Sequence, residues 1–558
     1  MMWRCQQHAS TRVVRHANKR LRGKWLIDQL SFLPDPTKTQ DDRDVYIRTV
    51  VPFSMISGLA MTAPFYGFNV WLIPMTLHIY GPEATYSLRT GSVLYVFSSQ
   101  LLAMAITGSL LAPHIRDGSL STGLGMLTGT VLSSSGLALT GLFLEMEMYG
   151  GLILSQFVLC GIGAGFCMTL IGYHGILWFR ETNRPALGAG LHGFFAGLWP
   201  ALFSFWGAAL ENAVGIGRSF YCVALMVALV QVPAILLTRS PTELPLLVQK
   251  ESVISEVISD PLRAAAEDEN GDADDKNIGN VQMSRSDDSS STKHNSTNIV
   301  GNQIDNEVET FEAQPALTRR ELLSCPQIWL QCFFLFMVFL PGFGIKYTIS
   351  PLMSTIFSAS EAVQSVASFL YLMSYSVTRL FVGFVAEIYL TPTSAAKIAT
   401  GIQLPSLFFM GSMVKLEATS NPWMWAFVVA MMVVGCGLAA SKVCIPLGAI
   451  ENWGIDNLAQ VNAMLQLSAG VAGVLGPFWI WFGLSRHSTG DLYIDDSLND
   501  TEEDKLDIQK IMGNHILMFG ACVTVGWLGE MFCVRKYKKV VHHVVNEGTS
   551  GNGQKGDR

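Results

Sequence analysis

Charged side chains are scarce in this chain of 558 residues: they make up 15% of it, whereas hydrophobic residues make up 50%. An ordinary soluble protein has roughly 25% charged residues. The shortage is concentrated in long apolar blocks, which is the pattern of a chain that crosses a membrane repeatedly. The formal net charge of -7 is less informative, because most acidic residues lie in two polar segments.

The sequence also lacks the short motifs of enzymes and metal proteins. Its ten cysteines are scattered, without a CxxC pair or another metal-ligand spacing, so we expect small apolar residues rather than metal ligands or disulfides. The glycine-rich stretch Gly161–Gly165 lies inside an apolar segment and lacks the strand-to-helix context of a dinucleotide site. There is no Walker motif. We therefore predict no enzyme activity, no cofactor, no metal and no nucleic-acid partner.

Twelve apolar segments of membrane-spanning length follow one another at fairly even spacing: Thr49–Leu72, Ser92–Ala112, Leu120–Leu142, Gly151–Trp178, Ala186–Leu210, Phe220–Leu237, Trp329–Ser350, Ala362–Ala386, Ala396–Val414, Met424–Leu447, Ala459–Leu484 and His515–Val534. A long polar gap divides them six and six. The predicted fold is an all-α integral membrane protein with twelve transmembrane helices in two six-helix pseudo-symmetric halves.

The polar segments predict the topology. A basic arm (1–48) precedes the first half (49–237), a low-complexity segment (238–325) separates it from the second half (326–534), and a basic then polar tail (535–558) follows. The positive-inside rule places the arm, the central segment and the tail in the cytoplasm, and the composition of the central segment predicts disorder. We favour the plasma membrane, although the Arg-rich arm also fits an organellar address.

The two halves carry similar glycine patterns. Gly161–Gly165 precedes Trp178 in the fourth segment, and Gly435–Ala439 precedes Trp453 after the tenth. An internal repeat of this kind predicts a substrate site near the middle of the membrane, between two halves that move against each other.

One cation, Arg379, lies near the middle of the eighth segment. A charge there costs about 2.5–3.5 kcal/mol on insertion scales, so it usually has a partner or faces a wet cavity. A guanidinium offers a bidentate fork to a carboxylate and stays charged at any cellular pH. We expect Arg379 to bind an anion; the alternatives are a structural cation bonded to helix carbonyls and a side chain that snorkels towards the cytoplasmic face near Glu387.

The chain resembles the major facilitator superfamily. The stretch CGIGAGFCMTLIGYHGILWFRETNRPALGAGLHGFFAGLWP resembles the glycine-rich fourth and fifth spans of the oxalate/formate antiporter-like family, which is related to the monocarboxylate transporters. Thr318–Phe336 and AGVAGVLGP, Ala469–Pro477, are similar to that family's seventh and eleventh spans. The resemblance implies the twelve-helix fold, transport of a small organic anion, and a carboxylate-binding role for Arg379.

The sequence departs from these families at the other charged positions. The resemblance to oxalate carriers would place a second cation, a lysine, at Ala469. The lysine of the first span of monocarboxylate transporters is also missing, and Tyr375 stands where those proteins have an acid one turn before the arginine. Because a second carboxylate would be desolvated without a partner, a one-cation pocket should prefer a monocarboxylate such as pyruvate, lactate or formate.

Three titratable residues accompany Arg379. His192 is pseudo-symmetric with Ala469, since each stands eight residues before a proline; it could carry a coupled proton or merely bond a neighbouring helix. Lys346 is placed towards the outer face, as an anion attractor or a snorkelling cation. Lys442 lies near the inner gate, where snorkelling or ion pairing is favoured. Further candidates are Tyr375, Asn69, Gln100 and Tyr173 for substrate binding, and His174, Glu387 and Arg116 for gating or coupling.

The sequence thus predicts a secondary active or facilitative transporter of a small organic anion, with a proton as a candidate co-substrate and the lipid bilayer as its surroundings. Two alternatives stay open. The solute could be neutral or cationic, with Arg379 structural, or the chain could be a membrane receptor or scaffold that signals through its 238–325 segment.

Overall fold

The computed structural model describes residues 39–81, 88–116, 118–239, 319–454, 457–488 and 509–532, together with residues 34, 36 and 317. Most of the predicted basic arm, central segment and tail lies outside these residues. Within them the chain is helical almost throughout and has no strand. The all-α prediction is therefore confirmed for the described part of the chain.

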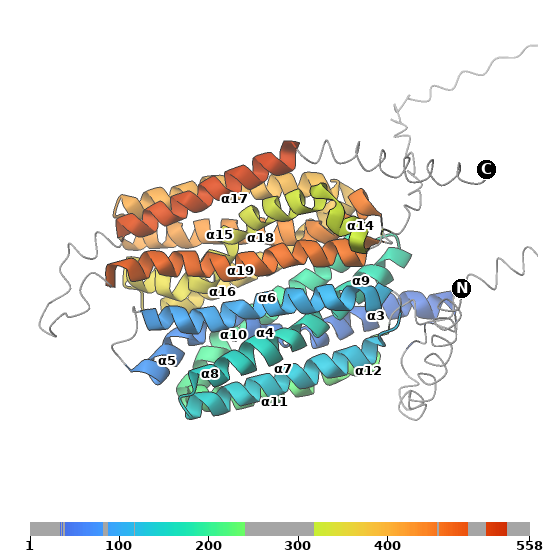
Figure 1. Ribbon diagram of the computed structural model, residues 1–558, viewed down its shortest axis with the longest axis horizontal. Coiled ribbons are helices and arrows are strands. Elements are labelled where there is room, and N and C mark those ends of the chain that lie inside the picture. The colour runs from blue at the N-terminus through green and yellow to red at the C-terminus, as the bar shows by residue number, and fades with distance from the viewer. Residues whose placement is uncertain are drawn as a thin grey trace, which may run out of the picture. The chain divides into compact units, whose positions relative to one another are not determined.

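The helices follow the predicted order (Figure 1). The N-terminal half consists of α3 (Gln40–Gly58), α4 (Thr62–Gly67), α5 (Asn69–Tyr80), α6 (Leu88–Arg116), α7 (Thr122–Glu145), α8 (Tyr149–Leu152), the π-helix η2 (Ile153–Cys160), α9 (Gly161–Glu181), α10 (Pro185–Val214), α11 (Ile216–Val230) and α12 (Val232–Leu237). The C-terminal half consists of α14 (Arg319–Ser324), α15 (Pro326–Phe357), α16 (Glu361–Ile388), α17 (Pro392–Lys415), α18 (Asn421–Trp453), α19 (Leu458–Ser488) and a last helix, Gln509–Phe532.

Ten helical segments among the described residues are long and apolar enough to cross a membrane. The other two predicted spans correspond to the first, which is broken into α3, α4 and α5, and to the ninth, α17. All twelve predicted spans are thus helical in the structure. Two of them, the first and the ninth, are not both long enough and apolar enough to count among the ten.

Proline chemistry explains the break in the first span. Pro64 has no N–H to donate to the carbonyl of Ala60, and its ring would collide with that carbonyl in a continuous helix. The chain tightens there: the N–H of Thr62 donates to Leu59 O and that of Ala63 to Ala60 O, at 2.9 and 3.1 Å. The short α4 that follows carries Tyr66, which is fully buried.

Contacts between helix ends define two faces of the bundle. Arg43 of α3 donates to the Glu181 carboxylate of α9 through Nε and Nη2, at 2.7 and 2.6 Å. Trp178 donates to the carbonyl of Arg239, just beyond α12. We call this side the N-terminal face, because α3 begins there. At the opposite face, the ring of His78 lies 3.0 Å from Leu144 O, and Gln509 donates to Ile356 O.

The two halves are joined mainly by two helix pairs, α10 with α16 and α6 with α19. Figure 1 shows α6 beside α19. Small residues allow the close approach: a Cβ on Gly383 would lie 2.7 Å from the Cα of Gly190, and one on Gly470 would lie 2.9 Å from the Cβ of Ala105. In each pair the second span of one half packs against the fifth span of the other: α16 with α10, and α6 with α19. This reciprocal pairing is expected when a pseudo-two-fold axis relates the halves.

Candidate functional site

A central cavity lies between the two halves and encloses about 980 Å³, its mouth included. Its walls come from the parts of six helices that point towards the N-terminal face, together with α4. The lining residues are Tyr66, Met104, Ala105, Gly108, Ala112, Ile115, Met168, Thr169, Gly172, Tyr173, Ile176, Ala189, His192, Arg379, Lys442, Val443, Pro446, Leu458, Ala459, Asn462, Ala463 and Gln466. No carboxylate is among them.

Arg379 enters this cavity from α16 and is 6% exposed. Its Nη1 donates to the carbonyl of Gly193 on α10 at 3.1 Å, and its Nε has no hydrogen-bond partner. The glycine makes room for the side chain, because a Cβ at Gly193 would lie 2.8 Å from both Cδ and Nε of the arginine. The other face of the guanidinium lies over the Tyr375 ring, with Cζ 4.9 Å from the centroid.

Lys442 supplies a second cation to the same cavity. It comes from α18 and is also 6% exposed. Its Nζ lies 4.6 Å from the Phe343 ring centroid and 5.8 Å from that of Tyr66. The predicted snorkelling towards the membrane surface is wrong, since the ammonium group is buried. The prediction of a pocket with a single cation is also wrong, because Lys442 lines the cavity together with Arg379.

Lys346 lies behind Tyr66, outside the set of lining residues. It is 1% exposed, and its Nζ has no hydrogen-bond partner. The ammonium sits 3.6 Å from the centroid of the Tyr66 ring and 5.0 Å from that of Tyr375, with Tyr347 at 5.5 Å. The sequence predicted a position towards the outer face or a snorkelling side chain; both predictions are wrong, because Lys346 is buried in the interior. α15 is kinked close by, at Thr348 (φ -120°, ψ 16°).

Unpaired donors are concentrated around this cluster. Arg379 Nε, Lys346 Nζ and the hydroxyls of Tyr347 and Tyr375 are buried without an acceptor. The one ion pair found among the described residues joins Arg43 to Glu181, so none of the three cations is neutralised by a described carboxylate. Buried donors and cations of this kind are costly unless an anion or water satisfies them. Of these cations, Arg379 and Lys442 line the cavity, which is therefore suited to hold an anion.

Two other predicted residues line the cavity, His192 and Tyr173. The Nε2 of His192 is buried without a partner, and its ring packs on Gly172, where a Cβ would lie 3.3 Å from Nε2. An imidazole in this position can accept or donate at Nε2 towards a molecule in the cavity.

Tyr375 lies outside the cavity walls, as Lys346 does, and so do three further predicted residues, Asn69, Gln100 and His174. Asn69 Nδ2 donates to Ser368 Oγ of α16 at 2.9 Å. Gln100 donates to the Gln156 side chain on η2, within the N-terminal half. The Nε2 of His174 lies 3.5 Å from Ser54 Oγ. The structure therefore gives these three side chains partners in the protein instead of a place on the cavity wall.

The contact of Asn69 belongs to a closed region between the cavity and the opposite face. There the ring centroids of Phe68 and Tyr347 lie 5.3 Å apart, joining the first span to α15. Those of Phe205 and Phe369 lie 4.5 Å apart, joining α10 to α16. The two halves thus meet on this side, whereas the cavity occupies the side of the N-terminal face.

The predicted gating residue Glu387 also joins the halves. Its Oε2 accepts a hydrogen bond of 3.2 Å from the backbone N–H of Leu187, in the first turn of α10. A carboxylate there complements the free N–H groups and the dipole of the helix start. The side chain of Arg116 lies outside the described part of the chain.

The sequence did not predict Tyr66, Asn462 or Gln466 as lining residues. Asn462 and Gln466 stand four residues apart in an apolar stretch and therefore share a helix face, which was an available signal. For Tyr66 the only signal in the sequence was Pro64, which marks the break in the first span two residues earlier.

The profile of the Major Facilitator Superfamily matches residues 54–477, which include every described residue of the central cavity. A search of curated proteins gives no match. The match covers far more than half of the sequence, and the helical architecture agrees with it. The chain belongs to the major facilitator superfamily and is a multi-pass membrane transporter.

Proposed function

We propose that the protein transports a small organic anion, with Arg379 holding a carboxylate in the central cavity. The observation that carries the proposal is Arg379, whose Nε lacks an acceptor in a cavity that also contains Lys442 and has no acidic lining residue. A carboxylate would accept a hydrogen bond from Nε and offset the charge of the two cations that line the cavity. A neutral or cationic solute would leave the charge of Arg379 without a counterion, and the hydrogen bond of Nη1 to the Gly193 carbonyl leaves Nε available for an anion.

The preferred substrate is a monocarboxylate with a second oxygen. Arg379 offers Nε to the carboxylate, while Lys442 lines the same cavity and can donate to a neighbouring oxo or hydroxyl group. Pyruvate and lactate carry such an oxygen and formate does not, so pyruvate and lactate fit this pair of donors better.

A dicarboxylate is the second candidate, and Lys442 is the observation that favours it. The case against a second carboxylate was the lack of a second cation, and Lys442 supplies one from α18 instead of from the position of Ala469. A short dianion could then place one carboxylate on each cation.

Alternating access fits the contacts between the halves. The halves meet through Asn69–Ser368 and Phe68–Tyr347 on the side of the opposite face, so a substrate could leave only towards the N-terminal face. We propose that release of these contacts, with closure of the cavity mouth at the N-terminal face, exposes the site to the other side. His192 is a candidate carrier of a coupled proton, because its Nε2 reaches the same cavity.

We propose that the N-terminal face is cytoplasmic and that the protein resides in the plasma membrane. The basic residues of the arm and of the tail support this orientation. Fusion of the first 40 residues to a reporter tests the alternative of an organellar address: the reporter should stay in the cytosol, and import into an organelle would overturn the assignment.

The test is a substrate panel with purified protein in proteoliposomes. Labelled pyruvate and lactate should be taken up faster than acetate, formate or a neutral analogue of the same size. Uptake of malonate above that of pyruvate would select the dicarboxylate candidate. Uptake of the neutral analogue alone, with the same rate in Arg379→Ala, would contradict the proposal. Deletion of residues 245–312 should leave uptake largely intact, whereas a signalling scaffold would show no uptake to begin with.

A further inference from the structure

Lys346 is a buried cation that the proposed contact of an anion with Arg379 and Lys442 leaves unused. Its side chain is 1% exposed, and its Nζ has no hydrogen-bond partner. Among the described residues it takes part in no ion pair either. An ammonium group that is removed from water without a counterion costs free energy, so an intramembrane lysine of this kind is expected to have a functional role. The residues that cover Lys346 indicate what that role is.

Three tyrosine rings surround the ammonium group of Lys346, and they come from both halves. The Nζ lies 3.6 Å from the ring centroid of Tyr66, 5.0 Å from that of Tyr375 and 5.5 Å from that of Tyr347. Tyr347 on α15 and Tyr375 on α16 belong to the C-terminal half, as Lys346 itself does. Tyr66 on α4 belongs to the N-terminal half. When the halves move against each other, the contact with Tyr66 is therefore the one of the three that changes.

Tyr66 forms the part of the cavity wall that covers Lys346. Its ring lines the central cavity, whereas Lys346 is not among the lining residues. The Tyr66 hydroxyl donates to the Sδ of Met104 on α6, at 3.9 Å. This hydrogen bond stays within the N-terminal half, so the ring would move with that half and not with Lys346.

The contacts that close the cavity on the side of the opposite face lie directly beside this ring. The ring centroids of Phe68 and Tyr347 are 5.3 Å apart, and this contact joins the two halves. Phe68 stands two residues after Tyr66, and Tyr347 directly follows Lys346. Separation of Phe68 from Tyr347 would therefore draw Tyr66 away from Lys346 and uncover the ammonium group towards the opposite face.

Arg379 would remain beside Lys346 in that movement. The ring centroid of Tyr375 lies 4.9 Å from Cζ of Arg379 and 5.0 Å from Nζ of Lys346. All three residues belong to α15 and α16, which pack against each other within the C-terminal half. The hydroxyls of Tyr347 and Tyr375 are buried without a partner as well. Opening towards the opposite face would thus expose an ammonium group and two hydroxyl donors next to the guanidinium that is proposed to hold the carboxylate.

We propose that Lys346 is an anion-binding residue of the state that opens towards the opposite face, and that Tyr66 covers it in the state described here. The second oxygen of the substrate would contact Lys442 while the cavity is open towards the N-terminal face, and Lys346 when it is open towards the other side. Arg379 would hold the carboxylate in both states. The buried ammonium group thereby gains a counterion for part of each cycle. The inference rests on the proposed anion transport by alternating access.

The direct test follows the acylation of native lysines by a small water-soluble reagent in the purified protein, with each lysine quantified from its peptide by mass spectrometry. Asn69→Cys and Ser368→Cys are combined, so that a disulfide between them holds the side of the opposite face closed. Oxidation should lower the labelling rate of Lys346 by about fivefold or more, because the disulfide removes the state in which Tyr66 is displaced. A reductant should restore the rate, whereas Lys442 should be labelled in both forms.

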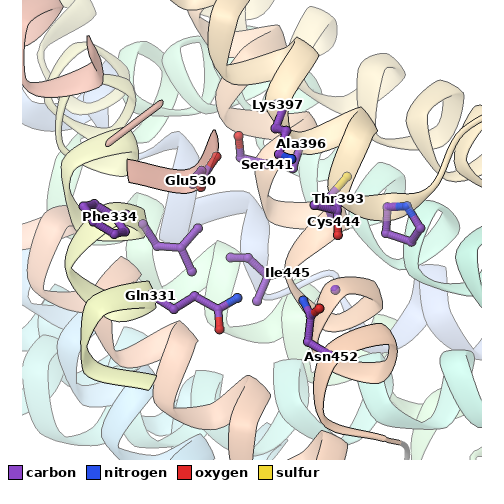
Figure 2. A pocket seen from close by; sticks show the side chains of 13 residues that line it. Gln331, Phe334, Thr393, Ala396, Lys397, Ser441, Cys444, Ile445, Asn452 and Glu530 are labelled. Atoms are coloured by element: carbon purple, nitrogen blue, oxygen red, sulfur yellow. The ribbon is translucent and has the colours of Figure 1, made fainter. Parts of the chain in front are cut away.

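Two other lysines are internal controls. Lys415 is exposed at the end of α17 and reports the activity of the reagent. Lys397 lines a separate cavity, whose walls on α15, α17, α18 and the last helix all belong to the C-terminal half (Figure 2). Movement of the halves against each other leaves these walls together, so oxidation should change neither control. Equal labelling of Lys346 in the two forms, or labelling in neither form while Lys415 reacts, would overturn the proposal.

Protection by substrate connects the uncovered lysine with the anion. In the reduced protein, pyruvate should slow the labelling of Lys346, and its neutral amide should not. Protection of Lys442 alone, or of neither lysine in a protein that takes up pyruvate, would overturn this inference and leave the proposed function standing. Protection of neither lysine, with no uptake of any carboxylate, would contradict the proposed function and the inference with it.

Lys346→Met separates an anion ligand from a structural cation. Methionine keeps much of the aliphatic stem and removes a buried charge that has no ion pair, so the thermal stability should be unchanged or higher. Counterflow of labelled pyruvate should nevertheless fall by about 10-fold or more, in line with a lost charge-assisted hydrogen bond. If this variant does not fold, the labelling of the native lysine still decides the question. Lys415→Met, at the exposed end of α17, should keep the wild-type rate. Wild-type counterflow by Lys346→Met would overturn the proposal.

Discussion

At the scale of single residues, two tyrosine rings hold three cations together. Tyr375 contacts Arg379 and Lys346, and Tyr66 contacts Lys346 and Lys442. Aromatic faces attract cations, by about 0.5–2 kcal/mol for each contact, but this does not replace a counterion for groups removed from water. Burying these cations therefore still costs free energy, and a bound anion would reduce that cost.

Lys442→Gln tests the second donor of the cavity. The amide keeps a hydrogen-bond donor but loses the charge, so uptake of pyruvate and lactate should weaken by about 10-fold, in line with a charge-assisted hydrogen bond. Acetate has no second oxygen and should lose less. The half-saturating concentration in proteoliposomes is the measured quantity. Equal weakening for all three substrates would mean that Lys442 acts only through its overall charge.

At the scale of helices, glycine on α10 positions the arginine of α16. The close approach of the two helices leaves no space for a side chain at Gly193, and the stem of Arg379 fills that position. The backbone carbonyl of the same residue accepts a hydrogen bond from Nη1. One residue of the N-terminal half therefore sets both the location and the orientation of a cation that belongs to the C-terminal half.

Gly193→Ala should impair transport without removing any functional group. The added methyl would meet Cδ and Nε of Arg379 at 2.8 Å, so the guanidinium must move and the affinity for the anion should fall severalfold. Gly448→Ala is the control, because a Cβ there meets nothing within 4 Å on α18. The half-saturating concentration should rise for the first variant alone. Normal affinity in Gly193→Ala would show that the arginine tolerates displacement.

The order of the helices was predictable from the sequence, and the composition of the site was predictable only in part. Apolar length located the spans, and an isolated charge identified Arg379. The sequence does not reveal how far neighbouring helices are shifted along their axes. Counting residues along the helix therefore predicted a depth for Lys346 that differs from that of Arg379. The kink of α15 at Thr348 and the break before Tyr66 are also departures from regular helix that apolar length does not reveal. Asn69, Gln100 and His174 looked equally polar in the sequence, but their partners come from distant segments.

At the scale of the whole molecule, contacts between the halves close the side of the cavity that faces away from the N-terminal face. Asn69 and Ser368 belong to different halves and are joined by a hydrogen bond of 2.9 Å, so they mark the region that must open during a transport cycle. The packing of α10 on α16 and of α6 on α19 provides the surfaces along which the halves could turn.

A disulfide between Asn69→Cys and Ser368→Cys should hold this side closed. Oxidation of the double variant should abolish counterflow, and a reductant should restore it, because the halves can no longer separate there. Each single variant is the control for the ten native cysteines and should be insensitive to oxidation. Full counterflow in a quantitatively cross-linked sample would contradict the assignment of this contact to the transport cycle.

The most direct test of the central claim is counterflow of labelled pyruvate by Arg379→Lys, compared with the wild type and with Arg218→Lys. Arg218 is exposed on α11, far from the cavity walls, and its variant controls for expression and reconstitution. A lysine keeps the charge but not the bidentate fork, so we predict a fall of about 10- to 100-fold at subsaturating substrate, as for a lost charge-assisted hydrogen bond. Wild-type counterflow by Arg379→Lys, at the same half-saturating concentration, would contradict the claim that Arg379 holds the carboxylate.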